Sequence, residues 1–208
     1  MVFSEMTGKR KYELKLRGEQ LQETRQRITE ATMELHRTVG PAATQISEIA
    51  RRAGVQRVTV YNHFPDDASL LMACSAHWRS LHPAPDPAEW LRSDDAGERT
   101  RLALHRLYAW YRETEPMTAN VLRDAEVLPE LRRVVGQGLG AYLDHVRSTL
   151  IGPWSGRAQD PEALSASVAA VTDFHFWRSL APLGDDRAAD LGARTVQAAC
   201  ELAAPATA

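Results

Sequence analysis

The sequence predicts an all-α protein of about nine helices. Apolar residues recur at helical spacing along the 208 residues, and no convincing strand pattern appears. Between residues 24 and 37, Ile28, Ala31 and Leu35 fall at i, i+3 and i+7, on one face of an amphipathic helix. Gly and Pro stand where helices are expected to stop, as at Gly40-Pro41. Periodicity and these terminating residues together predict the fold class.

Three shorter helices are expected after this first one. Thr44 is a suitable N-cap for a second helix, which Gly54 ends after about two turns. A third helix is expected from about Arg57 to His63. In a fourth, Asp66 can cap and Asp67 lies near the positive helix end. The residues expected on the buried sides of the second and third helices are Ile46, Ile49, Ala50, Ala53, Val60 and Phe64.

Composition describes an ordinary soluble globular protein, with 44% hydrophobic and 25% charged residues. No apolar run approaches the roughly 20 residues that a membrane span needs. The N-terminus lacks the apolar stretch of a secretory signal, so we expect a cytoplasmic protein without a membrane partner. Cys74 and Cys200 are the two cysteines, which argues against a disulfide framework and a Cys-rich zinc site. Both are expected to be buried as small apolar residues.

Charge is distributed unevenly along the chain. Residues 1–65 hold 11 Lys and Arg against 7 Asp and Glu, whereas residues 66–208 hold 14 against 20. A basic N-terminal part on an acidic remainder suggests that the N-terminal part binds a polyanion. From charge alone, an ordinary fluctuation in composition along the chain explains this difference equally well.

Two short helices joined by a tight turn that contains Gly are the helix-turn-helix pattern. The second helix of such a unit enters the major groove and presents its N-terminal residues to base edges. Arg pairs well with guanine and Asn with adenine, while hydroxyls and His suit phosphates. The alternative is a helical hairpin with a solvated polar face. The side chains that the third helix would offer are Arg57, Thr59, Tyr61, Asn62 and His63.

The stretch "ISEIARRAGVQRVTVYNHFPDDASLL", residues 46–71, resembles the DNA-binding segment of the TetR family of bacterial transcriptional regulators. The resemblance spans about residues 24–75 and combines spacings from several helices. Its matching features are Ile49-Ala50, Ala53-Gly54-Val55, Thr59, Tyr61 and Phe64-Pro65.

This resemblance implies a dimeric repressor that binds a palindromic operator and is released by a small hydrophobic effector. Residues 1–22 would form a flexible basic arm, 23–68 the DNA-binding domain, and 69–208 the effector-binding and dimerisation domain. The resemblance assigns phosphate contacts to Thr44, Thr59, Tyr61 and His63, and places Gln56, Arg57, Val58 and Asn62 toward the bases.

Three residues depart from the family's pattern. Gln56 replaces the usual Ser N-cap, which weakens capping of the third helix. Val58 replaces a common Gly or Ala, and Asp67 stands where the family often has a Lys that reaches the DNA backbone. An acid there would weaken operator binding. The arm "KRKYELKLR" is basic enough to compensate in an adjacent groove, and a disordered leader is the alternative.

The body is expected to contain five further helices after a Pro- and Asp-rich connector. The last two helices would pair with the same helices of a second copy in a four-helix bundle. The alternative, an intramolecular core, explains the same apolar pattern. The apolar residues concerned are Ala166, Val168, Ala169, Val171, Thr172, Phe176, Leu191, Val196, Ala199 and Leu202. The expected helices cover about residues 98–113, 117–124, 129–150, 161–180 and 185–202, with Gly136, Gly138 and Gly140 loosening the third.

Small-molecule pockets are mostly apolar with a few converging polar groups. An aromatic, nearly uncharged lining would suit a hydrophobic effector, although each candidate residue could instead belong to the core or the surface. The candidates for the effector pocket are Trp78, His105, Tyr108, Met117, Asn120, Val121, His145, His175 and Trp177.

Enzymatic and metal-binding functions are not indicated by the sequence. Asp173 and His175 are two residues apart and would point to different sides of a helix. No HExxH or CxxC spacing and no Gly-rich phosphate loop occurs, so we expect no cofactor, metal or catalytic residue. Asp67 and Gln56 leave one rival hypothesis open, a TetR-shaped protein that binds a small molecule or a partner and has weak or lost DNA binding.

Overall fold

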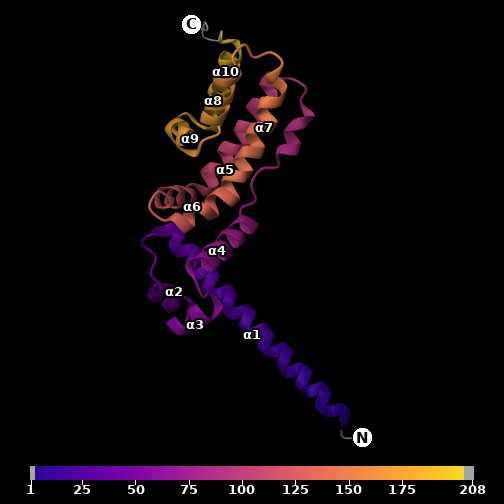
Figure 1. Ribbon diagram of the computed structural model, residues 1–208, viewed down its shortest axis with the longest axis vertical. Coiled ribbons are helices and arrows are strands. Elements are labelled where there is room, and N and C mark those ends of the chain that lie inside the picture. Colours follow the sequence, from indigo (N-terminus) through magenta and orange to yellow (C-terminus); the bar gives the residue numbers. More distant parts are fainter. Residues whose placement is uncertain (1–2, 204–208) are drawn as a thin grey trace. The chain divides into compact units, whose positions relative to one another are not determined.

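The structure is a computed structural model that describes residues 3–203 (Figure 1). Ten α-helices, two 3₁₀ segments and one π-helical segment make up these residues, and no strand occurs among them. The predicted all-α class is confirmed. The chain divides into two compact units, each described separately below. Unit 1 contains residues up to Leu81 together with Ala119–Val134, and unit 2 contains His82–Thr118 and the residues from Val135 onward.

Unit 1 is built on a small helical core. Its helices are α1 (Phe3–Thr38), α2 (Ile46–Ala53), α3 (Arg57–His63) and α4 (Asp67–Leu81), joined by the end of α5 (Ala96–Ala125) and by α6 (Pro129–Val135). The helix α1 packs against both α2 and α4. The inward positions predicted from periodicity are confirmed, with Ile46 and Ala31 partly buried at the margin. The fully buried members of this core are Ile28, Leu35, Ile49, Ala50, Ala53, Val60, Phe64 and Leu70.

The helix α1 begins at Phe3, much earlier than the expected start near Thr24. Residues 3–22, expected to be a basic arm, therefore belong to this helix. Strong helix formers such as Glu, Lys, Leu, Arg and Gln fill this segment, and it contains no Pro. Unit 1 thus includes this extension, α4 and the end of α5 in addition to the residues 23–68 expected for the DNA-binding domain.

The loop before α2 is held by the last turns of α5. Asn120 donates hydrogen bonds to the carbonyl oxygens of His36 and Arg37 at 3.2 and 2.9 Å. Asp124 accepts a hydrogen bond from the Ala42 N–H at 2.9 Å. Burial opposes ionisation of Asp124, but hydrogen bonds from Arg123 and from that N–H keep its pKa below the ordinary value. The C-terminal carbonyls of α1 and the loop that follows are therefore fixed by side chains some 80 residues away in sequence.

The expected N-cap of α2 is wrong by one residue. Gln45 occupies the cap position and makes no side-chain cap hydrogen bond, whereas the Thr44 hydroxyl donates to the carbonyl of Gly40 at 2.8 Å. Gly40 has φ +94°, and a Cβ there would lie 2.5 Å from Oδ2 of Asp124. The tight turn after α1 takes up the Thr44 hydroxyl, which is why it does not cap α2.

Several helix boundaries expected after the connector differ in the structure. The segments expected at 98–113 and 117–124 form one helix, α5, with Pro116 inside it. The segment expected at 129–150 divides into α6, the π-helical η2 (Gly136–Gly140) and α7 (Ala141–Ser155), so the three glycines do interrupt the α-helix. The connector contains a 3₁₀ turn, η1 (Pro87–Arg92), that buries Trp90.

The helix expected at 161–180 is broken in the structure. It forms α8 (Pro161–Val171) and α9 (Phe174–Leu180), followed by η3 (Ala181–Leu183) and α10 (Asp185–Glu201). Asp173 accepts hydrogen bonds from the N–H groups of His175 and Phe176, and so caps a new helix. The periodicity of apolar residues continues across this point, and the capping carboxylate of Asp173 is the signal in the sequence that marks the break.

Buried tyrosines of α5 close the carbonyl end of α8. The Tyr108 hydroxyl donates to the Val171 carbonyl at 2.7 Å, and the Tyr111 hydroxyl donates to the Thr172 carbonyl at 2.8 Å. Gly192 of α10 is buried, and a Cβ at this position would lie 2.7 Å from Cδ1 of Leu104 and 3.2 Å from the Tyr108 hydroxyl. A side chain at residue 192 would therefore push α10 away from α5 and disturb this cap.

Both cysteines are buried and free, as predicted. Nδ1 of His36 lies 3.5 Å from Sγ of Cys74 in the interior of unit 1. Burial lowers the pKa of His36 to about 4, against an opposing effect of Asp124. His36 is therefore neutral at physiological pH.

Burial of neutral His36 predicts a specific loss of stability in mild acid. In the unfolded chain the imidazole takes up a proton as the pH falls through its ordinary value of 6.5, whereas in the folded chain it resists protonation to about pH 4. The contribution is thus fully present above pH 6.5 and is lost as the pH falls toward 4, by about 2 kcal/mol between pH 7.5 and pH 5. Urea unfolding at both pH values should show this loss in the wild type and a smaller one in His36→Leu. An equal loss in both proteins would contradict it.

Candidate nucleic-acid interface

A left-handed glycine makes the turn between α2 and α3. Gly54 has φ 66° and ψ 39°. Its N–H donates to the Arg51 carbonyl at 3.3 Å, and the N–H of Val55 donates to the Ala50 carbonyl at 2.9 Å. These two bonds form the Schellman arrangement, which satisfies carbonyl groups at the end of α2 and reverses the chain. The predicted helix-turn-helix is therefore present, and its turn depends on the positive φ of Gly54.

The helix α3 buries one side and exposes the other. Val60 is fully buried and Phe64, just after the helix, is 2% exposed. Val58 and Tyr61 are 58% and 47% exposed, although both are large hydrophobic residues. Thr59, His63 and, in the loop before α2, Thr44 are half-buried. The residues predicted to face bases or phosphates that are exposed on this side are Gln56, Arg57, Val58, Tyr61 and Asn62.

Two arginines of α1 hold the carbonyl ends of α2 and α3. Arg27 donates from Nη1 to the Ala53 carbonyl at 3.0 Å, at the end of α2. Arg25 donates from Nη1 to the His63 carbonyl at 2.6 Å, at the end of α3. The Arg25 guanidinium also stacks over the Phe64 ring, 4.0 Å from its centroid. In the sequence these two arginines indicate only basic charge, and nothing in their spacing indicates their role as caps.

Part of the basic charge in this segment is neutralised within α2. Glu48 accepts hydrogen bonds from Arg51 at 2.7 and 2.8 Å and from Arg52 at 2.9 Å. Hydrogen bonds from these two arginines lower the pKa of Glu48 to about 2, so the ion pairs persist at any physiological pH. Arg57 is exposed and has no ion-pair or hydrogen-bond partner among the residues described. The cation left available for a polyanion on α2 and α3 is therefore Arg57.

The ends of α3 and α4 agree with the predicted capping. Gln56 stands at the N-cap of α3 and makes no side-chain cap hydrogen bond, as expected for a residue that replaces Ser. Asp66 accepts a hydrogen bond from the Ser69 N–H at 2.7 Å, which lowers the pKa of Asp66 and caps α4. Asp67 is the first residue of α4 and is exposed.

Three candidates for the effector pocket lie in unit 1. Trp78 is half-buried on α4. Asn120 binds the carbonyl end of α1, and Val121 is half-buried next to it. Within unit 1, these three residues thus belong to the partly buried interior or to the hydrogen bonds that cap α1.

The other six candidates lie in unit 2 and occupy different environments. Tyr108 and Trp177 are fully buried, and Met117 is 5% exposed. Nε2 of His105 lies 2.9 Å from Oδ1 of Asp186. His145 and His175 are exposed, on α7 and α9. Tyr111, Phe174 and Trp177 form an aromatic cluster with ring centroids 5.4 to 5.6 Å apart, and only the last of these three was predicted.

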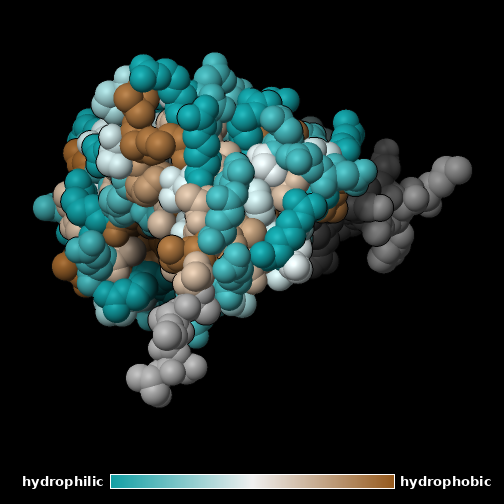
Figure 2. Space-filling model, turned by 90° about the horizontal axis from the view of Figure 1, so that it is seen from above, coloured by the Kyte–Doolittle hydropathy of each residue, from teal (hydrophilic) through white to brown (hydrophobic). Residues whose placement is uncertain are grey.

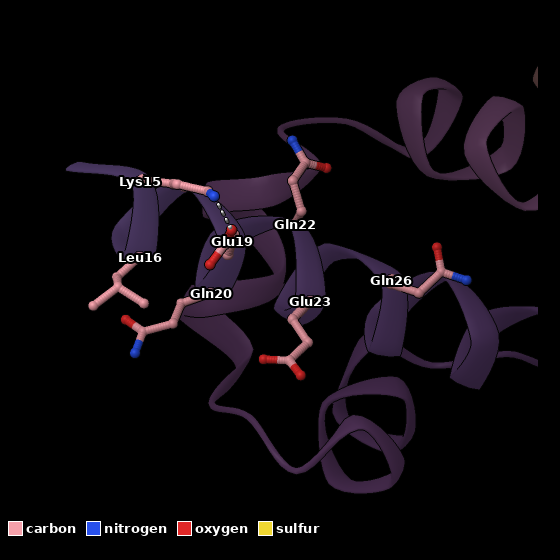
Figure 3. A pocket seen from close by; sticks show the side chains of 8 residues that line it. Lys15, Leu16, Glu19, Gln20, Gln22, Glu23 and Gln26 are labelled. Atoms are coloured by element: carbon pink, nitrogen blue, oxygen red, sulfur yellow. Dashed lines mark ion pairs between the residues drawn. The ribbon is translucent and has the colours of Figure 1, made fainter. Parts of the chain in front are cut away.

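One open concavity lies along the free part of α1 (Figure 3). All the described residues that line it belong to that single helix, among them Lys15, Glu19 and Gln26. A hollow bordered by one helix cannot enclose a small molecule as effector pockets do. No described side chain assigned to the effector pocket contributes to it.

Neither a metal centre nor a membrane segment is evident in the residues that the structure describes. They contain no group of three or more His, Cys, Asp or Glu residues placed to hold a metal ion. No helix in residues 3–203 is long and apolar enough to span a membrane.

Residues 28–74 match the family model of bacterial regulatory proteins, tetR family. This segment runs from the buried Ile28 of α1 to Cys74 of α4 and includes the complete helix-turn-helix. Residues 28–74 are therefore a TetR-family domain (the TetR-type domain). No curated protein matches the chain.

Solved structures show that the whole TetR-like fold is shared. A transcriptional regulator from Rhodococcus sp. Rha1 is 19% identical, with a TM-score of 0.60 over 85% of this chain and 96% of its own. A TetR transcription regulator from Haloarcula marismortui is 16% identical, with a TM-score of 0.57 over 86% and 97% of the two chains. The transcriptional regulator FadR from Bacillus subtilis, in complex with stearoyl-CoA, is 17% identical, with a TM-score of 0.56 over 84% and 97%. Unlike the family match, this likeness extends well beyond residue 74.

Because of the turn at Gly54, substitution by alanine should have opposite effects on stability at Gly54 and at Gly18. Gly54→Ala should destabilise the TetR-type domain by about 1–2 kcal/mol, because an L-residue in the left-handed region is strained. The space around it does not forbid a methyl group, since the nearest atom is 3.6 Å away. Gly18→Ala is the matched control: Gly18 lies inside α1 with no atom near its Cβ position, so alanine should stabilise by up to about 1 kcal/mol. Urea unfolding of both variants tests this, and equal effects would contradict the role of the turn.

Proposed function

We propose that the protein is a TetR-like transcriptional repressor, which binds a palindromic operator as a homodimer and is released by a small hydrophobic effector. The observation that carries this proposal is the exposed side of α3, with Arg57, which has no ion-pair partner among the described residues, at its start and Asn62 near its end. A second helix of a helix-turn-helix presents such side chains to the major groove. The proposal includes no catalytic step and no cofactor.

Arg57 and Asn62 suit base edges, and Gln56 and Val58 lie beside them on α3. The hydroxyls of Thr44, Thr59 and Tyr61, with His63, suit phosphates and would set the position of α3 on the duplex. Val58 is more than half exposed, so its methyl groups are free to contact a thymine methyl.

Pairing of α8 and α10 with a second copy would give the homodimer. The two helices pack against each other within unit 2, and Val168, Val171, Thr172, Val196 and Ala199 are buried there. The intramolecular alternative thus accounts for these five residues. Ala166, Leu191 and Leu202 remain exposed and are small or apolar, which supports a further helix packing on this side. The face shown in Figure 2 is mostly hydrophilic with scattered hydrophobic groups, so apolar contact surface is limited there.

Effector binding is proposed in unit 2, whose interior is rich in aromatic side chains. The stearoyl-CoA complex of FadR shows that a protein of this fold accepts a ligand with a long apolar chain. The helix α5 is continuous from Ala96 to Ala125, and its last turns hold the loop before α2 through Asn120 and Asp124. A shift of α5 on effector binding would therefore change the position of that loop and of α2.

A second candidate function is a TetR-shaped binding protein with weak DNA affinity. The exposed Asp67 at the start of α4 and the pairing of Arg51 and Arg52 with Glu48 favour it, because both reduce the attraction for phosphates. Selection of bound sequences from a random duplex pool separates the two functions. Enrichment of a palindrome supports the repressor, and no enrichment at low salt supports the binding protein.

Arg57 and Tyr61 are expected to contribute to DNA binding in different ways. Tyr61→Ala should weaken binding to operator and random duplex alike, because a phosphate contact carries no sequence information. Arg57→Ala should weaken operator binding by about 1–3 kcal/mol and relax the preference at one base position. Arg106→Ala, which removes an exposed arginine of α5, serves as the control and should change neither. Fluorescence anisotropy on both duplexes measures the effects, and equal losses for Arg57→Ala on both would remove its role in reading bases.

Substitution of Asp67 tests where α4 begins relative to bound DNA. Asp67→Lys should bind the operator more tightly, with a salt dependence steeper by about one unit per subunit, because one more phosphate is neutralised. The melting temperature should fall slightly, since a Lys opposes the dipole at a helix N-terminus by about 0.3–1 kcal/mol. Binding measured across a salt series decides the matter. Unchanged affinity and slope would show that Asp67 lies away from the DNA.

A further inference from the structure

The ion pair of Arg51 with Glu48 on α2 uses the same donors that a phosphate group would take. Nε and Nη2 of Arg51 donate to the two carboxylate oxygens of Glu48 at 2.8 and 2.7 Å. Arginine binds carboxylates and phosphates alike in this bidentate way, through two parallel N–H groups. A phosphate that binds Arg51 in this way must therefore first displace the carboxylate of Glu48.

The two arginines bound to Glu48 differ in their surroundings. The side chain of Arg51 is 70% exposed, whereas that of Arg52 is 35% exposed. Hydrogen bonding to Arg37 lowers the pKa of Glu34 on α1, and the nearby charge of Arg52 adds to this effect. Arg52 is thus close to two carboxylates and partly covered, and Arg51 is the arginine that a ligand in solution can reach.

Arg51 lies at the end of α2, beside the turn to α3. Its carbonyl accepts a hydrogen bond from the N–H of Gly54 at 3.3 Å. The helices α2 and α3 pack against each other within unit 1 (Figure 1). In a helix-turn-helix bound to DNA, the second helix lies in the major groove and the first helix crosses the phosphate backbone. Exposed side chains of α2 would therefore lie near phosphates while α3 reads the bases.

The stability of α2 depends little on these ion pairs. Exposed pairs three or four residues apart contribute only weakly to the stability of a helix. Burial of Ile49, Ala50 and Ala53 holds α2 on the core of unit 1. The effect of Glu48 on charge is larger, because two arginines and one glutamate leave α2 with a net charge of +1.

We propose that Glu48 is an internal competitor of DNA phosphates, which withholds Arg51 and so lowers the sequence-independent part of the affinity for DNA. The inference rests on the proposed function, and it adds a residue that opposes binding. Phosphate contacts supply nearly all of the affinity for random DNA. The base contacts proposed for Arg57 and Asn62 do not involve Glu48, so binding of the operator depends more strongly on them.

Simple repulsion between Glu48 and the phosphates is the alternative to competition for Arg51. Under repulsion the two residues act independently, and the effects of substituting them add. Under competition, removal of Glu48 has its effect only if Arg51 is present to bind the phosphate. A double-mutant cycle therefore distinguishes the two.

The cycle consists of Glu48→Gln, Arg51→Gln and the double variant. Glutamine is close to glutamate and arginine in helix propensity and removes the charge of either. Glu98→Gln is the matched control, because Glu98 pairs with Arg101 three residues later at 3.0 Å, on α5 in unit 2. Each full-length protein is titrated across a salt series with a random duplex and with the selected operator, by fluorescence anisotropy. Urea unfolding shows which variants are folded.

Glu48→Gln should bind the random duplex more tightly than the wild type. Its salt dependence should be steeper by about 2 units for a dimer, because each subunit neutralises one more phosphate. Addition of Arg51→Gln should cancel this gain, whereas Arg51→Gln alone should change the salt dependence little. Glu98→Gln should resemble the wild type.

Three results would overturn the inference. Additive effects of the two substitutions would replace competition by simple repulsion. An unchanged salt dependence in folded Glu48→Gln would mean that Arg51 does not reach a phosphate. A large loss of slope in Arg51→Gln alone would mean that Arg51 already binds one, and this variant decides the matter even if Glu48→Gln does not fold.

The random duplex separates this inference from the proposed function. If the wild type selects no operator and the cycle on random duplex is non-additive, the repressor is wrong and the competition by Glu48 stands. If the wild type selects an operator and the cycle is additive on both duplexes, the repressor stands and the inference is wrong.

Discussion

The carbonyl ends of two very short helices depend on side chains from α1. The helices α2 and α3 have eight and seven residues, well below the length at which a helix is stable alone in water. Burial of Ile49, Val60 and Phe64 stabilises their inner sides. The last carbonyls still need donors, and Arg27 and Arg25 provide them while Gly54 reverses the chain between the two helices. The orientation of the exposed side of α3 follows from these contacts.

The C-terminal end of α1 is likewise held by side chains that bind backbone groups. Its final carbonyls and the loop before α2 receive hydrogen bonds from Asn120 and Arg123, and Asp124 accepts one from the loop. Gly40 is needed there because a Cβ would collide with the carboxylate of Asp124. The last turns of α5 therefore hold the loop before α2 in unit 1 through hydrogen bonds to and from backbone groups.

Ion pairs within the TetR-type domain make its electrostatic attraction for DNA weaker than its composition suggests. Glu48 pairs with two of the three arginines of the α2–α3 segment, Asp66 caps α4, and Asp67 is its first residue. Among the described residues of α2 and α3, Arg57 remains as an exposed cation without an ion-pair partner. In the proposed function, operator affinity thus depends on how many phosphates α3 and the residues beside it reach, and the salt dependence of binding measures that number.

Periodicity and turn chemistry alone determined the all-α class, the inward positions Ile28, Leu35, Val60 and Phe64, and the turn at Gly54. These features are local, because residues three or four apart share a helix face and only Gly readily adopts a positive φ. Tertiary structure decided the contacts between distant residues: the caps from Arg25 and Asn120, the burial of Trp90, and the tyrosine hydroxyls that close α8. It also decided that Thr44 binds Gly40 and does not cap α2, because a hydroxyl has several acceptors within reach and the folded turn selects one.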